Sequence, residues 1–560
     1  MKNKRFNYDL KLIIVLLINI IIFSVCNVIF NIKYEQVDDF IIYNLYSGLD
    51  GTYNMHGIYM HSALCFIISL LFRIIPIINW HSIYLLCMQF LCFTLIGYKI
   101  VKKHDNGISI VLYTIFASIA YTTMLLLIQY TSVAALLILT SFVLLIDMLE
   151  KDEELNTKDI VAIFLLYTLG VMTRTQAILI AAPFILVYLI INYIKLIFFK
   201  SVSKDKVFKI IKYYAVYLII TVILFLSNYL IYNSNETYRE YVQYNNIRTV
   251  LHDRVNLDYE KDKQIFEEIG WSKNDYDIFY TFGFGDENIF SKENLQKLYN
   301  YAIEKYGKYQ INNNTLADFI DEVKDSKIFI FSIIVLFISL FKGDYENIIL
   351  FLITILMQIL YIFIGRNMPR VVIPEYIAGL SLMIYNLKLN KSDINTGLKN
   401  YTIMCLMIFF TCALVGTAYS FNYKLKYYKN YQEIIEYTNN NKQNVYLYTV
   451  PSLQFRYLAY SVYQMPPKGS FSNLRVIGGW DMYTQNYYDF KNRYQLEGTL
   501  LDLLKENVYL IDGDVNWSGK IYNNYKGNII SAIKEHYNID TSCTKIKEFD
   551  NIKIYKLQNK

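Results

Sequence analysis

Long apolar runs, separated by short polar or basic segments, occupy the first three quarters of the chain. Each run has about 16 to 22 residues, close to the about 20 residues that a helix needs to cross the hydrocarbon core of a bilayer. Because lipid cannot satisfy backbone hydrogen bonds, such segments cross the membrane as helices. Eleven runs therefore predict membrane spans: 10–30, 82–98, 109–128, 132–149, 159–174, 177–196, 212–232, 327–342, 347–364, 371–387 and 401–420.

A further apolar run, 58–78, is interpreted differently because of the charges around it. Basic loops stay in the cytoplasm, and both the N-terminal segment 1–11 and the loop 195–212 are strongly basic. Two segments lie on the same side of the membrane only if an even number of spans separates them. Both basic segments can therefore be cytoplasmic only if 58–78 does not cross the membrane. We therefore predict a membrane-embedded or interfacial helix, interrupted near Arg73 and Pro76, that returns to the outer face. The N-terminus is then cytoplasmic and the C-terminus extracytoplasmic, in a multi-pass protein of the plasma membrane.

Two large polar segments, 233–326 and 421–560, fall outside the membrane in this topology. In the tail, YQEIIEY and NIISAIKEHY have a helical period, whereas NVYLYTV reads as a strand and TLLDLLKENVYLID combines the two. The tail is therefore predicted to be a small α/β domain. The expected organisation is a transmembrane domain, 1–420, with extracytoplasmic loops 31–57 and 233–326, followed by an extracytoplasmic domain, 421–560.

Composition agrees with a membrane protein and excludes several other classes. The chain is 54% hydrophobic and only 18% charged, with a mean hydropathy of +0.25, and a water-soluble protein of this size would carry more charge. The net charge of +6 is not gathered into an arm of the kind that binds nucleic acid. Six of the seven cysteines lie in apolar runs without zinc-ligand spacing, which indicates small apolar side chains.

Two adjacent acids follow the first span, in the segment KYEQVDDFIIYNLYSG. Desolvation near a bilayer and mutual repulsion can bring a carboxylate into the pKa range of a general base. Paired oxygens can instead hold a divalent cation, Mg or Mn, that neutralises a phosphate leaving group. The structural alternative is that Asp38 and Asp39 cap a helix starting near Phe40. Because neighbouring side chains point in different directions, we expect one acid to face a cavity and the other to brace the loop, with Asp39 in the cavity.

Three isolated arginines, Arg174, Arg366 and Arg370, lie between apolar runs at the predicted outer face. Cations amid apolar sequence are costly and tend to face a polar cavity or an anionic partner. The guanidinium fork matches phosphate oxygens, so the three predict a site for a lipid phosphate. The alternative is that each reaches up to the headgroups as an ordinary interfacial arginine.

Further polar residues are candidates for substrate contact. His56 and His61, in MHGIYMHSALCF, open the embedded helix close to the acidic pair, and the sequence offers metal ligation, substrate contact or polar packing for them. In the outer loop the candidates for sugar or acceptor binding, or for a folded cap with capped helices, are Asn246, Arg248, Asp253, Trp271, Asp275 and Asp286. The turn-rich segment RVIGGWDMYTQ, with an apparently exposed Trp480, favours a structural role.

An anchor helix, an outer loop with an Asp-Asp pair, an embedded His-containing helix, many spans and an extracytoplasmic tail together resemble the GT-C superfamily of integral-membrane glycosyltransferases. The segments DDFIIYNLYSG, PIINWHSIYLL, YNNIRTVLHD, GWSKNDYDIF and GGWDMY are also similar to uncharacterised bacterial multi-span membrane proteins from surface-polysaccharide contexts. The fold class expected from this resemblance is a polytopic α-helical membrane protein, GT-C-like, with about eleven spans, an embedded helix and the C-terminal α/β domain.

The resemblance implies a sugar donor linked to polyprenyl phosphate, a cell-surface glycan or lipid-linked acceptor on the outer face, and inversion at the anomeric carbon. It implies that Asp38 or Asp39 is the first-loop acid that deprotonates the acceptor or binds a metal ion. The chain lacks the WWD-type tail signature and the His-Pro-Pro stretch of known branches, which leaves the acceptor open. The alternative functions are a polysaccharide flippase or transporter, a Wzy-like polymerase, and a non-catalytic membrane scaffold.

Overall fold

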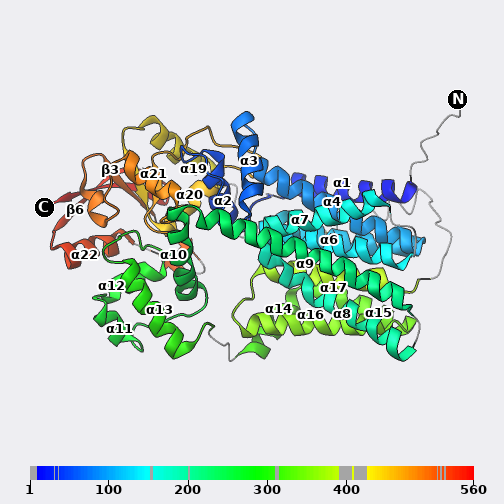
Figure 1. Ribbon diagram of the computed structural model, residues 1–560. Coiled ribbons are helices and arrows are strands. Elements are labelled where there is room, and N and C mark those ends of the chain that lie inside the picture. The colour runs from blue at the N-terminus through cyan, green and yellow to red at the C-terminus, as the bar shows by residue number, and fades with distance from the viewer. Residues whose placement is uncertain are drawn as a thin grey trace.

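The protein has a helical bundle on one side and a mixed helix and sheet part on the other (Figure 1). The computed structural model describes residues 9–560 except 31, 36, 152–155, 200–201, 310–313, 390–406, 409–410, 412–425, 514, 518–519 and 523–524. Helix α1 begins at the end of the bundle far from β6 and the C-terminus (Figure 1). The predicted fold class, a polytopic helical membrane protein with a C-terminal α/β domain, is confirmed.

Every predicted span within the described residues is a helix. Seven helical stretches there are long and apolar enough to cross a membrane. The bundle helices are α1 (Leu10–Ile29), α4 (Trp80–His104), α5 (Gly107–Leu126), α6 (Tyr130–Glu150), α7 (Thr157–Thr173), α8 (Ile178–Ile194), α9 (Lys204–Asn233), α15 (Lys327–Lys342), α16 (Tyr345–Phe363) and α17 (Pro369–Asn386). Most of the predicted span 401–420, and the predicted boundary at 420, lie outside the described residues.

Helix α6 is the centre of the bundle. It packs against α4, α7, α8 and α17, and nearly all of its side chains are buried. Its sequence, YTSVAALLILTSFVLLIDMLE, is apolar or small on every side, which is the pattern of a helix surrounded by other helices. Helix α9, in contrast, packs on one side only and exposes large apolar residues along most of its length, as a helix that faces lipid does.

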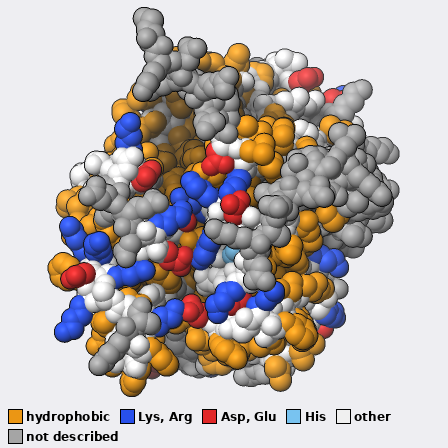
Figure 2. Space-filling view, turned by 90° about the vertical axis from the view of Figure 1, so that its right-hand side faces the viewer, with side chains coloured by type: hydrophobic (Ala, Val, Ile, Leu, Met, Phe, Trp, Pro, Cys, Tyr) orange, Lys and Arg blue, Asp and Glu red, His pale blue; other side chains and the backbone are white. Residues whose placement is uncertain are grey.

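The bundle end far from the sheet carries the basic loops, and we call it the basic end. Ion pairs join its helices there: Lys99 to Asp147, Lys103 to Glu150, Lys195 to Glu346 and Lys388 to Asp344. Figure 2 views this end and shows many Lys and Arg side chains gathered on it. The opposite end, where α4, α6 and α17 begin, adjoins the sheet part, and we call it the domain end.

The apolar run 58–78 contains one short helix, α3 (Ser62–Ile74). At 1.5 Å per residue its 13 residues extend for about 20 Å, too short for the about 30 Å of a hydrocarbon core. His61 caps its start, and it ends just before Pro76. Helix α2 (Val37–Ser47) packs against it, and both lie at the domain end (Figure 1). The run therefore forms a helix too short to span the membrane, as predicted, whereas its embedded or interfacial position stays a prediction.

The tail folds around a five-stranded sheet of order β2-β1-β3-β7-β6. Strand β1 is parallel to β2 and β3, whereas β7 is antiparallel to β3 and β6. Its main elements are α19 (Lys426–Asn440), β1 (Val445–Tyr448), β2 (Leu474–Val476), α21 (Gln485–Arg493), β3 (Val508–Gly513), α22 (Tyr525–Tyr537), β6 (Thr541–Phe549) and β7 (Ile552–Asn559). The strand pattern of NVYLYTV and the helical pattern of NIISAIKEHY are both confirmed, as β1 and α22.

The outer loop shares one hydrophobic core with the tail. The loop forms α10 (Glu236–Asp253), α11 (Lys263–Glu268), α12 (Lys273–Tyr280), α13 (Lys292–Tyr306) and α14 (Thr315–Asp325). Buried loop residues such as Phe279 and Phe290 belong to the same cluster as Leu510 and Ile533 of the tail. The backbones also meet directly, because Gly479 N–H donates to the Phe282 carbonyl at 2.9 Å. Loop and tail therefore form one packed outer part.

Candidate active site

Asp39 is completely buried in the first turn of α2. Its Oδ1 accepts hydrogen bonds from His81 Nε2 at 3.0 Å and from the backbone N–H of Tyr130 at 3.1 Å. The other ring nitrogen of His81 bonds to the hydroxyl of Tyr46. Burial raises the pKa of Asp39, while the hydrogen bond from His81 opposes that rise. The prediction that Asp39 faces a cavity is wrong, because its carboxylate instead ties α2 to the starts of α4 and α6.

Asp38 is the member of the pair that keeps solvent access. Its side chain is 18% exposed, and its Oδ2 lies 3.8 Å from Nη1 of Arg370 at the start of α17. Successive residues of a helix point about 100° apart, so the two carboxylates leave α2 in different directions. Asp38 therefore lies beside Arg370 with partial solvent access, whereas Asp39 is enclosed, and a catalytic role for either acid stays a prediction.

A third carboxylate, Glu35, joins Asp38 at the same arginine. Glu35 Oε2 lies 3.9 Å from Nη1 of Arg370, and its side chain is only 6% exposed. That oxygen is buried without a hydrogen-bond partner. Burial raises the pKa of Glu35 to about 7, against the lowering effect of Arg370 and with further rises from Asp38 and Asp39. Glu35 is thus an acid whose proton exchanges near neutral pH, and the sequence analysis did not single it out.

Arg174 lies where α7 ends and is held by two aromatic rings. Its Nη1 donates to the hydroxyl of Tyr130 at 2.8 Å, and its guanidinium carbon lies 4.7 Å from the centre of the Tyr59 ring. Its Nε is buried without a hydrogen-bond partner. Stacking on rings fixes a guanidinium plane without neutralising its charge. Arg174 therefore retains the capacity to bind an anion.

The other two predicted arginines meet Arg174 at the domain end. Arg370 interacts electrostatically with Tyr130, the residue to which Arg174 donates, and Arg366 interacts with Arg370. Arg366 also interacts with Asp253 and Arg254 at the end of α10. The structure thus brings Arg174, Arg366 and Arg370 into one neighbourhood, although they come from two separate inter-helix loops.

Helix α10 of the outer loop adds two more cations to this neighbourhood. Arg248 is buried, with Nη1 3.7 Å from Asp253 Oδ1 and Nη2 3.4 Å from the hydroxyl of Tyr59. Arg254 follows at the C-cap of the same helix. We call the whole set the arginine site: Glu35, Asp38, Tyr59, Tyr130, Arg174, Arg248, Asp253, Arg254, Arg366 and Arg370. Five guanidinium groups face three carboxyls in it, so the site carries a positive excess that an anion would balance.

The two predicted histidines are committed to packing. His56 stacks on Tyr238 with ring centres 3.8 Å apart, and its Nδ1 bonds to Asn54 Oδ1 at 2.9 Å. Burial lowers the pKa of His56 to about 4, which keeps its ring neutral. His61 Nδ1 accepts from the backbone of Ala63, and its Nε2 faces the carbonyl of Leu224 and the hydroxyl of Ser227 at 3.2 and 3.1 Å. Neither ring forms a described contact with an arginine of the site.

The divalent cation suggested for Asp38 and Asp39 stays a prediction, because one Asp39 oxygen is engaged while its Oδ2 is buried without a hydrogen-bond partner. Asp39 directs its Oδ1 to His81 and Tyr130, whereas Asp38 faces Arg370. Within the described ranges, the only cluster of three or more His, Cys, Asp or Glu side chains placed to hold a metal ion lies elsewhere, in the outer part. No step of the chemistry below therefore passes through a metal ion at the acidic pair.

Several candidates in the outer part have structural roles. Trp271 is buried and donates from its indole nitrogen to the Ile289 carbonyl at 2.8 Å, and Ser272 with Asp275 forms the predicted helix cap as a full capping box. Asp286 accepts from the backbone of Leu500. Trp480 is buried rather than exposed, with its ring centre 5.1 Å from that of Tyr59. Of the outer-loop candidates, Arg248 and Asp253 reach the arginine site.

Comparison with known proteins gives no match by sequence and seven matching chains among solved structures. No family model matches the chain, and no curated protein matches it. The solved structures of ArnT from Cupriavidus metallidurans, in the apo state and bound to undecaprenyl phosphate, each align over 97% of both chains at 9% identity, with TM-scores of 0.42 and 0.40.

Proposed function

We propose that the protein is an inverting membrane glycosyltransferase that moves a sugar from a polyprenyl-phosphate donor to a cell-surface glycan or lipid-linked acceptor on the outer face. The observation that carries the proposal is the arginine site: five guanidinium groups with a net positive excess, beside three carboxyls, at the end of a membrane bundle. Such a site suits a phosphate carried on a lipid, because the bundle places it next to the membrane surface.

The chemistry follows from the two kinds of group in the site. Asp38 accepts the proton of an acceptor hydroxyl, whose oxygen forms a bond to the anomeric carbon as the bond from that carbon to the phosphate oxygen breaks. The bonding electrons leave with polyprenyl phosphate, and Arg174 and Arg370 stabilise the charge that develops there. Glu35, beside the same arginine, shares the proton with Asp38 or replaces it as the base. Attack opposite to the leaving phosphate inverts the anomeric centre.

The distribution of basic residues supports placing this site outside the cell. The basic end of the bundle gathers Lys side chains from the loops between spans, as cytoplasmic ends do (Figure 2). The arginine site lies at the domain end, since Tyr130 and Arg370 are at the starts of α6 and α17. A donor entering from the outer leaflet would reach it along the bundle surface.

Binding of undecaprenyl phosphate to the purified protein in lipid nanodiscs tests the proposal. We expect Arg370→Gln and Arg174→Gln each to weaken binding about tenfold or more, since each removes a charge-assisted contact to phosphate of about 1.5–3 kcal/mol. Arg239→Gln is the matched control, because Arg239 is half exposed and pairs only weakly with Glu236 at 3.7 Å. Equal binding by all four proteins would reject a phosphate role for the site, and would favour the scaffold or the transporter.

A further inference from the structure

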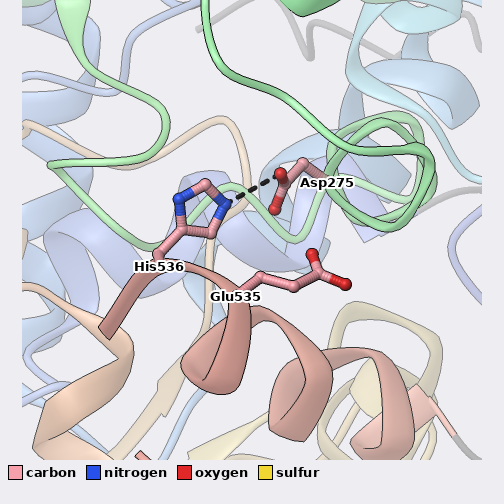
Figure 3. A group of neighbouring side chains, drawn as sticks. All are labelled: Asp275, Glu535 and His536. Atoms are coloured by element: carbon pink, nitrogen blue, oxygen red, sulfur yellow. Dashed lines mark hydrogen bonds and ion pairs between the residues drawn. The ribbon is translucent and has the colours of Figure 1, made fainter. Parts of the chain in front are cut away.

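Three potential metal ligands converge between the outer loop and the tail. Asp275 comes from α12, and Glu535 and His536 come from α22; their ligand atoms all lie within 4.8 Å of one another. Figure 3 shows the three side chains pointing toward one another. In Figure 1, α12 and α22 lie at the side of the molecule far from the bundle, so this cluster is separate from the arginine site.

The carboxylate of Asp275 has one oxygen with no partner. Its side chain has no solvent exposure, and Oδ2 accepts from the backbone N–H of Ser272 at 2.9 Å and from His536 Nε2 at 2.8 Å. Oδ1 is buried and forms no hydrogen bond. An unpaired buried carboxylate oxygen is costly, and a cation bound there would satisfy it.

The other two ligands are open to solvent, so an ion can reach the cluster. Glu535 and His536 are exposed on α22, and Glu535 Oε2 accepts from the Ser272 hydroxyl at 2.8 Å. One imidazole and two carboxylates form the ligand set of a borderline cation, whereas Mg²⁺ and Ca²⁺ prefer oxygen alone. In a zinc site with bonds of about 2.0–2.2 Å, neighbouring ligand atoms lie about 3–3.5 Å apart. Small rotations of the Glu535 and His536 side chains can bring the three ligand atoms to that spacing.

We propose that Asp275, Glu535 and His536 bind a zinc ion that joins the outer loop to the tail, with water as the fourth ligand. The ion takes the place of the hydrogen bond between His536 Nε2 and Asp275 Oδ2, and binding by both oxygens of the Asp275 carboxylate also gives Oδ1 a partner. The ion then bridges two segments that are about 260 residues apart in the chain. Asn274, whose side chain donates to the Asn528 carbonyl at 2.9 Å, joins α12 to α22 beside it. The ion is structural, and it is independent of the proposed transfer reaction.

Zinc titration of the chelator-treated full-length protein in detergent tests the proposal. We expect one zinc ion per chain by calorimetry, together with a higher unfolding temperature, because a ligand that binds only the folded state stabilises it. His536→Gln and Glu535→Gln should each weaken binding at least about 10–100-fold, the range known for removal of groups that merely support metal ligands.

The matched control is Glu506→Gln, which removes an exposed carboxylate of the tail outside the cluster. It should bind zinc as the unaltered protein does. In EDTA all four proteins should unfold in one cooperative transition, with His536→Gln and Glu535→Gln lower only by the loss of their hydrogen bonds to Asp275 and Ser272, which shows that the variants fold. If the unaltered protein binds no zinc, or if His536→Gln and Glu535→Gln bind it undiminished, the proposal is overturned.

Discussion

Asp38 and Asp39 are adjacent in the sequence but belong to different environments: Asp38 lies beside Arg370 with solvent access, and Asp39 is sealed against His81. The pair therefore combines a group available for chemistry with a group that holds the loop in place. Replacement of the two acids should consequently affect different properties of the protein, activity in one case and stability in the other.

For the first acid, Asp38→Asn keeps the shape of the side chain and removes the base. We expect a loss of about 10²–10⁴-fold in transfer, the usual scale of general-base catalysis, with normal protein level and unfolding temperature. Surface glycan labelling in cells, normalised to protein level, measures the effect. Full activity of Asp38→Asn together with loss in Glu35→Gln would assign the base to Glu35 instead.

For the second acid, Asp39→Ala leaves the His81 ring nitrogen and the Tyr130 N–H without their acceptor. Burying these unpaired groups should cost about 1–3 kcal/mol in free energy of unfolding. Fluorescence-detected size-exclusion chromatography after heating measures the resulting drop in unfolding temperature. Asp39→Asn, which retains an acceptor oxygen, should lose less stability, and an unchanged unfolding temperature in Asp39→Ala would contradict the bracing role.

Glu35 should make stability depend on pH. Its pKa rises from 4.5 in the unfolded chain to about 7 in the folded protein, so the protonated carboxyl favours folding. This contribution is complete below pH 4.5 and is lost as the pH rises through about 7. Between pH 5 and pH 8 the protein should lose up to about 3 kcal/mol relative to Glu35→Gln, which stays neutral. If the free energy of unfolding changes with pH in the same way in both proteins, the pKa of Glu35 is not raised and the prediction is wrong.

Arg174 should not be replaceable by lysine. Arg174→Lys keeps the charge but loses the planar group that stacks on Tyr59 and donates to Tyr130. We expect undecaprenyl phosphate binding to weaken about tenfold, while Arg239→Lys binds normally. Retention of binding in Arg174→Lys would mean that only the charge matters at this position.

The orientation in the membrane can be tested directly. A reporter fused after Lys560 should be active outside the cytoplasm, and one inserted within 200–210 should be active inside, because the basic end of the bundle faces the cytoplasm. If the reporter after Lys560 is active inside and the reporter within 200–210 is active outside, the arginine site lies on the cytoplasmic side. That result would exclude a reaction at the outer face.

The spans and the short helix could be predicted from sequence because they follow from local composition. Arg174, Arg366 and Arg370 could be grouped because alternating spans return their loops to the same end of the bundle. The partner of Asp39 could not be found this way. His81 lies 42 residues further along and reads as an interfacial anchor beside Trp80, yet it is fully buried.

Glu35 and Tyr59 were missed for a related reason. Glu35 lies in an extended segment whose backbone N–H donates to the Ile128 carbonyl at 2.9 Å, a contact with no local pattern. Tyr59 gains its importance from Arg174, Arg248 and Trp480, which come from three distant parts of the chain. Long-range packing, rather than periodicity, also buries Trp480, which the turn-rich sequence around it suggested to be exposed.

The common core of the outer loop and the tail has a consequence for how the protein is made. Phe279 and Phe290 pack with Leu510 and Ile533, so the loop leaves the translocation machinery long before its packing partners exist. About 120 residues of further synthesis, including several membrane insertions, separate the end of the loop from the start of β1. During that interval the aromatic residues of the loop lack their packing partners. Folding of the outer part is therefore among the last events of biogenesis, so that a chain lacking its tail would be inserted in the membrane with an incompletely folded loop.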